Sequence, residues 1–97
     1  MKIKESINKK IIKNDIDNEY CVLLDAWMST EFKLDKNLIS KSEAVEFLEW
    51  ATNQTKKAIS KFQKSNKEIF EESKDKFEKL FKSIEEFISN LSLDLKV

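Results

Sequence analysis

The side-chain types that enzymes use for catalysis are scarce in this sequence. It contains no His, and all 18 of its basic residues are Lys. It therefore lacks an imidazole base that titrates near neutrality and a guanidinium that grips phosphate or carboxylate with two hydrogen bonds. Cys21 is the single cysteine and has no His to activate it as a nucleophile. Its apolar neighbours at 20–24 predict a buried, inert thiol.

Acidic clusters are the remaining candidates for chemistry. The pairs at 71–72 and 85–86 are adjacent, and adjacent helical residues point about 100° apart, so neither pair converges on one substrate atom. Residues 15–19 resemble the opening of a calcium loop, but Tyr20 replaces the required Gly and Ala26 replaces the bidentate Glu. Solvated helix faces and an acidic first helical turn explain these patterns. We predict a non-enzyme with no catalytic residue, metal site or cofactor.

The composition indicates which elements would position these side chains. The 97 residues include no Gly and no Pro, which are the usual residues of turns in β and α/β folds. Glycine-rich phosphate loops are excluded for the same reason. Helices joined by short polar connections need neither residue. The sequence therefore predicts an all-α fold, a small helical bundle forming a single domain over 1–97.

Two short helices are predicted in the first part of the chain. An i, i+4 ridge of isoleucines predicts a helix over 2–13, followed by capping oxygens at 14–17. A second apolar face, from Ile16 to Trp27, predicts a helix over 16–28 with Trp27 in the core. Residues 29–40 lose the helical period and predict a connection whose apolar side chains still pack on the core: Phe32, Leu34, Leu38 and Ile39.

A long amphipathic segment follows a clear start signal. Ser40 and Glu43 have the spacing of a capping box. From there an apolar stripe keeps its phase over 41–91 and weakens at 63–68 and again at Ser73. The unbroken phase favours one helix of about 75 Å, because a loop normally resets the phase. The polar gap favours the alternative, in which the chain turns near residues 64–67 and closes a four-helix bundle.

A helix of that length would expose more apolar surface than the first 40 residues could cover. Large exposed apolar patches are unusual in monomers, so a partner chain would be required. We therefore expect a homo-oligomer, a dimer or larger, along the Phe-rich stripe from Phe62 to Leu91.

Opposed charges suggest where another protein could bind. Residues 15–50 carry three Lys and nine acidic residues, whereas 51–70 carry five Lys and one acidic residue. Trp50 falls about 120° from the centre of the apolar stripe, so it either caps the core edge or is an exposed aromatic anchor ringed by charge. The candidate partner-binding residues are Trp50, Glu43, Glu46, Glu49, Lys57, Lys61 and Lys64.

These observations favour a protein-interaction module that docks helical surfaces onto a partner protein. A phage or mobile-element inhibitor of a host machine, or a small subunit of a larger complex, would suit the Lys-, Ile- and Asn-rich composition of an AT-rich genome. A homo-oligomeric scaffold or surface coat is the alternative. Zero net charge and the lack of Arg argue against nucleic-acid binding, and the mixed Lys/Glu face argues against membrane-surface binding. No apolar run reaches the ~20 residues of a transmembrane span, so we expect a cytoplasmic protein, in the host cytoplasm if viral.

Overall fold

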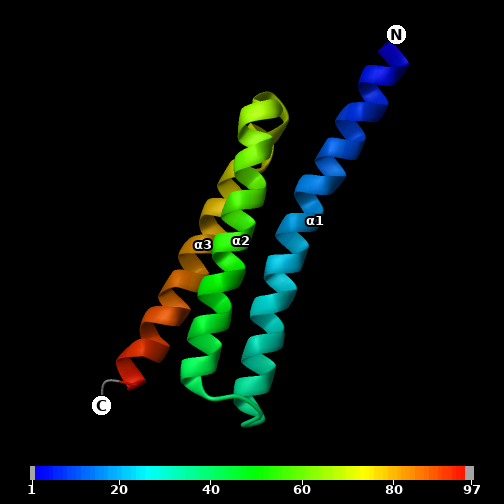
Figure 1. Ribbon diagram of the computed structural model, residues 1–97. Helices are drawn as coiled ribbons and strands as arrows, with labels where there is room; N and C mark the ends of the chain where they lie inside the picture. The colour runs from blue at the N-terminus through cyan, green and yellow to red at the C-terminus, as the bar shows by residue number, and fades with distance from the viewer. Residues whose placement is uncertain (1, 96–97) are drawn as a thin grey trace.

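The computed structural model describes the backbone of residues 2–95 and the side chains of residues 9–95. Over this range the chain forms three α-helices and no strand: α1 (Lys2–Asp35), α2 (Lys41–Ser65) and α3 (Lys67–Leu95). Successive helices run antiparallel in an elongated bundle measuring 60 × 21 × 16 Å (Figure 1). The all-α prediction is confirmed, but the predicted arrangement of two short helices and one long helix is not.

Helix α1 is continuous where the sequence predicted two helices and part of a connection. The expected caps at 14–17 lie on the helix instead, with Asn14 and Asp15 exposed to solvent. The inner face of α1 runs through this region, because Ile16 and Leu23 are buried and so is Thr30 beyond the predicted end at 28. The Thr30 hydroxyl donates to the Ala26 carbonyl at 2.7 Å, which lets a polar residue occupy the buried face.

Three side-chain predictions for this region are wrong. Cys21 is exposed, because only one face of α1 is covered and Cys21 lies on the outer face. Phe32 and Leu38 are also exposed, whereas Leu34 and Ile39 are half-buried as expected. In the isoleucine ridge predicted over 2–13, only the Ile11 side chain is described, and it is exposed. The side chains of Ile3 and Ile7 lie outside the described residues.

Helix α1 ends in a Schellman motif, in which a left-handed residue closes the last turn. Asn37 has φ 57° and donates its amide to the Leu34 carbonyl, while the Leu38 amide donates to the Lys33 carbonyl at 2.8 Å. Glycine is the usual residue at this position, but Asn tolerates the left-handed region. This explains how the chain turns out of α1 without any glycine.

The capping box predicted at the start of α2 is confirmed. The Glu43 amide donates to the Ser40 hydroxyl and the Ser40 amide donates to the Glu43 carboxylate, both at 3.1 Å. The Ser40 backbone amide, and then the Ser40 side chain, lower the pKa of Glu43 below its ordinary value. The stabilisation from this pairing is therefore present above the unfolded-state pKa and is lost as the pH falls through the folded-state value.

Replacing Ser40 by Ala should lower the free energy of unfolding by about 1 kcal/mol, because the substitution leaves a first-turn amide of α2 without its acceptor. Urea unfolding followed by circular dichroism measures this change. Ser42→Ala is the matched control, since Ser42 is an exposed serine of the same turn that does not cap the helix. Equal losses in the two variants would contradict a capping role for Ser40.

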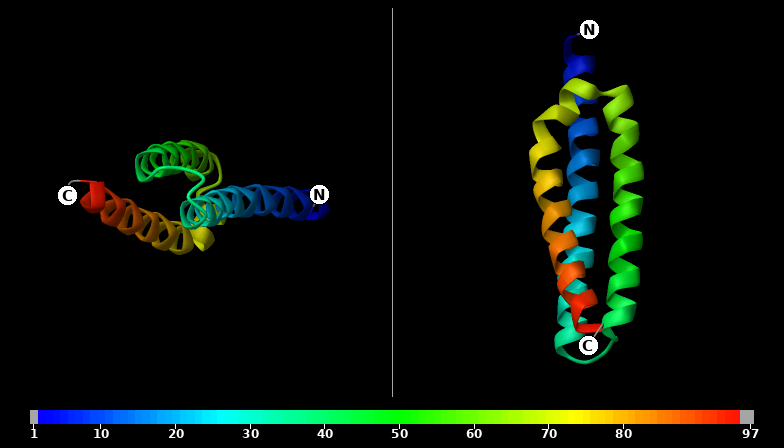
Figure 2. Two further views of the ribbon diagram at one scale, coloured as in Figure 1. Left: turned by 90° about the horizontal axis from the view of Figure 1, so that it is seen from below. Right: turned by 90° about the vertical axis from the view of Figure 1, so that its left-hand side faces the viewer.

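The segment predicted as one long helix is two helices that reverse direction at a single residue. Asn66 has φ −141° and ψ 53°, outside the helical region. Its amide donates to the Phe62 carbonyl at the end of α2, and its carbonyl accepts from the Phe70 amide in the first turn of α3. The break falls within the predicted range 64–67, but the hairpin joins a single helix α1 rather than closing a four-helix bundle (Figure 2).

The hairpin folds the Phe-rich stripe into the interior. One core cluster contains Leu23, Leu48, Ala51, Leu80 and Ile84, and the other contains Ile16, Ile59, Phe70 and Phe77. Each cluster takes residues from α1, α2 and α3, and Tyr20 and Phe81 pack against both. The chain's own helices cover most of those side chains, so no partner chain is needed to bury the stripe. The oligomeric state itself stays a prediction.

Ion pairs at the edges of the bundle join both α1 and α2 to α3. Lys76 reaches Asp17 of α1 at 2.7 Å and lies over the Tyr20 ring, 4.8 Å from its centroid. Lys56 of α2 pairs with Glu85 at 3.4 Å, and Lys41 pairs with Asp94 at 3.2 Å. Partly exposed pairs of this kind each contribute less than about 1 kcal/mol. Their main consequence is that the paired side chains are already engaged within the bundle. The unpaired charged side chains remain available to a partner.

Candidate partner-binding surface

An apolar groove lies between α1 and α2 and has a volume of about 190 Å³. The lining residues from α1 are mainly small or aliphatic, and those from α2 include two aromatic rings. The groove is lined by Glu19, Val22, Leu23, Ala26, Phe47, Trp50, Ala51, Gln54 and Thr55. Leu23 and Ala51 also belong to the core, so the groove floor is part of the rigid interior.

Trp50 and Phe47 form the aromatic rim of this groove. Their ring centroids are 6.2 Å apart, and the side chains are 58% and 43% exposed. Val22, across the groove on α1, is 64% exposed. The sequence left open whether Trp50 caps the core edge or stands exposed, and the structure places it in the exposed position. An exposed indole beside other apolar side chains is the typical centre of a protein–protein contact.

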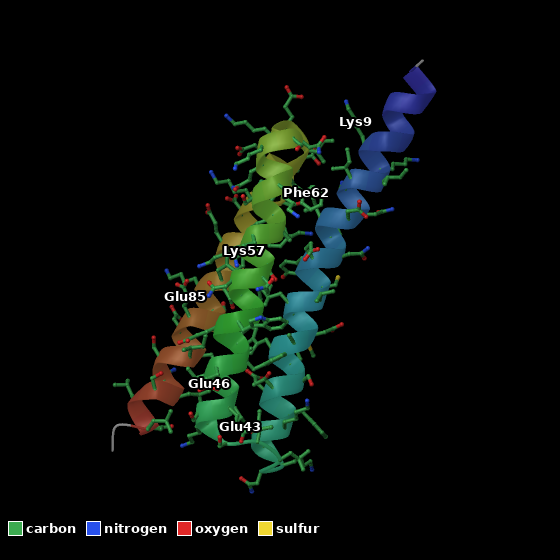
Figure 3. All side chains as sticks on the ribbon, viewed as in Figure 1. Lys9, Glu43, Glu46, Lys57, Phe62 and Glu85 are labelled. Atoms are coloured by element: carbon green, nitrogen blue, oxygen red, sulfur yellow. The ribbon has the colours of Figure 1, made fainter. Side chains whose placement is uncertain are left out.

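Most of the other predicted binding residues share one stripe of α2 with Trp50. At 100° per residue, an arc of about 60° contains Glu43, Glu46, Trp50, Lys57, Lys61 and Lys64. All six are exposed. Figure 3 labels Glu43 and Glu46 near the start of α2 and Lys57 farther along the same helix. Acidic side chains thus stand on one side of Trp50 and basic side chains on the other.

Glu49 does not belong to this stripe. It lies on the side of α2 that faces α3, about 100° from Trp50. The nearby Lys56 is similarly placed and pairs with Glu85 of α3. Among residues 9–95, by contrast, Lys57, Lys61 and Lys64 take part in none of the interhelical ion pairs. The basic half of the stripe is therefore free to meet a partner, as is Glu46.

The sequence did not identify Val22 and Phe47 as members of the surface. Phe47 fitted the apolar stripe of α2 and was expected in the core, but it lies at the edge of that stripe. Val22 lies on α1 away from the apolar face predicted between Ile16 and Trp27. The groove arises only where α1 and α2 meet side by side, so its members could be recognised from sequence only with that pairing known.

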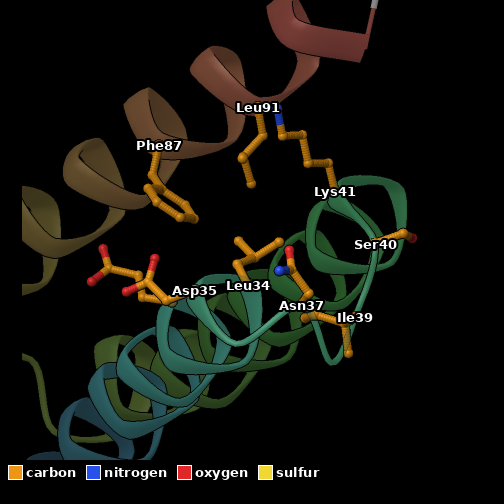
Figure 4. A pocket seen from close by; sticks show the side chains of 9 residues that line it. Leu34, Asp35, Asn37, Ile39, Ser40, Lys41, Phe87 and Leu91 are labelled. Carbon is orange, nitrogen blue, oxygen red and sulfur yellow. The ribbon is translucent and has the colours of Figure 1, made fainter.

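A second cavity, of about 460 Å³, lies where the α1–α2 connection meets the end of α3 (Figure 4). Leu34, Phe87 and Leu91 provide its apolar wall, and Asp35 and Lys41 stand at its polar edge. Ser40 also lines this cavity, where its hydroxyl accepts a hydrogen bond from the Glu43 amide as the N-cap of α2. The cavity lacks the exposed aromatic pair that distinguishes the groove at Trp50.

Within the described part of the chain, no three acidic or cysteine side chains are close enough together to hold a metal ion. None of the helices over 2–95 combines the length and the hydropathy needed to cross a bilayer. Both acidic pairs considered for general acid–base chemistry, at 71–72 and 85–86, are exposed on α3.

The fold and the surface together define an all-helical bundle with an aromatic groove between α1 and α2 and a charged stripe beside it. Comparison with protein-family models, with curated proteins and with solved structures finds no match to this chain. The function must therefore be inferred from the surface itself.

Proposed function

We propose that this protein is a non-enzymatic interaction module that docks onto another protein through the groove at Trp50. The observation that carries the proposal is the exposed Phe47–Trp50 pair above a floor of core residues. Large exposed aromatic side chains in a water-excluding setting supply most of the binding energy in protein interfaces. The surrounding Glu and Lys side chains would orient the partner and speed its encounter.

The biological forms that we propose remain those favoured by the composition. One is an inhibitor of a host machine encoded by a phage or mobile element, and the other is a small subunit of a larger complex. Both act by occupying a surface, which needs a rigid helical scaffold and no catalytic group. We also propose cytoplasmic residence, on the basis of the sequence. The homo-oligomeric scaffold is the second candidate, now through the outer surface rather than the buried stripe.

Site-specific photo-cross-linking in the cells that encode the protein tests the docking surface. A photoreactive phenylalanine at Gln54, which lines the groove, should give a discrete protein adduct. Trp50→Ala should reduce that adduct about tenfold or more, because the indole is expected to be a binding hot spot. Since Trp50 is 58% exposed, its truncation should leave the helical content and the melting temperature nearly unchanged.

Phe32 provides the matched control. It has the same exposed fraction as Trp50, 58%, but does not line the groove. The photoreactive residue at position 32 should give no discrete adduct, and Phe32→Ala should not affect the adduct formed at Gln54. Equal adducts at the two positions, or an adduct at Gln54 that survives Trp50→Ala, would place the contact elsewhere. Loss of helical content in Trp50→Ala would assign Trp50 to the core.

A further inference from the structure

We propose that the outer face of α2 binds a second copy of this chain, forming a two-fold symmetric dimer in which the two α2 helices lie antiparallel. This inference rests on the proposed function in one respect, namely that the Trp50 surface is the contact surface. It adds that the molecule bound at this surface is a second copy of the chain. The argument depends on the order of charges along α2, their exposure, and the symmetry of their spacing.

The charges on the stripe of α2 are self-complementary. Counted from the midpoint between Asn53 and Gln54, Glu46 and Lys61 lie equally far away on opposite sides, and so do Glu43 and Lys64. In an antiparallel pair related by a two-fold axis at that midpoint, residues at equal distances stand at the same height. Every acidic residue of the stripe then stands at the height of a basic residue of the second copy.

The aromatic residue fits the same symmetry. Trp50 and Lys57 are also equally distant from the midpoint, so Lys57 of the second copy stands over the Trp50 indole. An ammonium group over an indole face is the most favourable cation–π arrangement. Lysine ammonium groups already lie over other aromatic rings inside the chain, Lys76 over Tyr20 and Lys56 over Phe81 at 5.3 Å. The polar residues next to the axis, Asn53 and Gln54, are both exposed.

The helical spacing keeps these residues in one line. Glu43, Trp50, Lys57 and Lys64 follow one another at seven-residue intervals, which is the period at which two helices remain in contact. The line from Glu43 to Lys64 is about 32 Å long at 1.5 Å per residue. A parallel pair of α2 helices would set Glu against Glu and Lys against Lys. The charges therefore select the antiparallel arrangement.

The size of this face indicates how strong the dimer is. A strip about 32 Å long and about 10 Å wide buries on the order of 300 Å² per copy, less than the ~800 Å² per partner of a stable complex. Phe47 and Val22 at the edge of the strip add apolar area. We expect a dissociation constant on the order of 100 μM that rises with salt, because exposed charge pairs are screened.

Charge reversal tests the arrangement on the purified full chain. Glu46→Lys and Lys61→Glu each create two like-charge contacts per dimer, one for each symmetry-related pair. Each single variant should raise the dissociation constant about tenfold, measured by sedimentation velocity over a range of concentrations. The double variant E46K/K61E recreates both pairs with their signs exchanged and should restore the wild-type value. Glu49→Lys, the same change on α2 outside the stripe, should have little effect.

Each outcome decides the proposal. Restored association in the double variant supports it, because loss of folding would not be reversed by the second substitution. Glu49→Lys controls for net charge, since it changes the net charge by the same amount as Glu46→Lys. A monomer at every concentration would overturn the dimer, as would single variants that associate normally or a double variant no better than the singles.

None of the overturning outcomes tests the proposed function, which is measured separately by the adduct at Gln54. A monomer whose Gln54 adduct is lost in Trp50→Ala would refute only the dimer. A dimer with the expected charge behaviour, together with no Trp50-dependent adduct to a different protein, would instead refute docking onto another protein.

Discussion

Replacing Phe77 by Ala is expected to lower the free energy of unfolding by about 3–5 kcal/mol, which is a large part of the stability of a small domain. Phe77 is only 1% exposed and stands at the centre of an aromatic group. Its ring centroid lies 5.6 Å from Tyr20, 5.9 Å from Phe70 and 6.1 Å from Phe81. Removing it would leave a cavity between α1 and α3 that these rings could fill only in part.

Thermal and urea unfolding, followed by circular dichroism, measure this loss. Phe32→Ala is again the matched control, because it removes the same atoms from an exposed position and should change the free energy of unfolding by about 0.5 kcal/mol or less. Similar losses in the two variants would mean that Phe77 is not enclosed as described.

Ser29→Pro is expected to destabilise the protein by about 3 kcal/mol or more. Ser29 lies inside α1, and a proline there removes a backbone amide from the helix and clashes with the preceding turn. The Ser29 side chain is exposed, so the effect would come from the backbone alone. Helical content and unfolding midpoint by circular dichroism measure it, with Ser29→Ala as the control that keeps the amide.

This variant distinguishes the continuous helix α1 of the structure from the connection that the sequence predicted over 29–40. If 29–40 were a connection, as the loss of periodicity indicated, proline at 29 would be tolerated with little change in helical content. A small effect of Ser29→Pro would therefore show that α1 ends early in solution. A large effect, with Ser29→Ala close to the wild type, would support the continuous helix to Asp35.

Signals confined to a few neighbouring residues were predictable from sequence. The pairing of Ser40 with Glu43 depends on two side chains three positions apart, and it was identified correctly. The all-α class likewise follows from the absence of Gly and Pro. The end of α1 was missed because Asn37 takes the left-handed conformation that usually identifies a Gly, and because Thr30 occupies a buried position expected to be apolar.

Features that depend on packing between helices were harder to predict from the sequence. The apolar phase is unbroken across Asn66, so periodicity alone does not distinguish a long helix from a hairpin closed by one residue. Once the chain reverses there, the stripe becomes the core and the need for a partner to cover it disappears. Trp50 was identified because it departs from the stripe of its own helix. Val22 became part of the surface only because α1 packs beside α2.

The single-residue connection at Asn66 also has a consequence for how the chain folds. Closing a short loop costs little conformational entropy, so α2 and α3 can meet early and provide a surface on which α1 docks. Each helix then packs on its neighbour in the chain, and helical topologies dominated by such local contacts fold within microseconds to milliseconds. With no proline in the sequence, no slow peptide-bond isomerisation delays that search. We expect such a chain to fold quickly, which shortens the time during which its Phe-rich segments are exposed to aggregation.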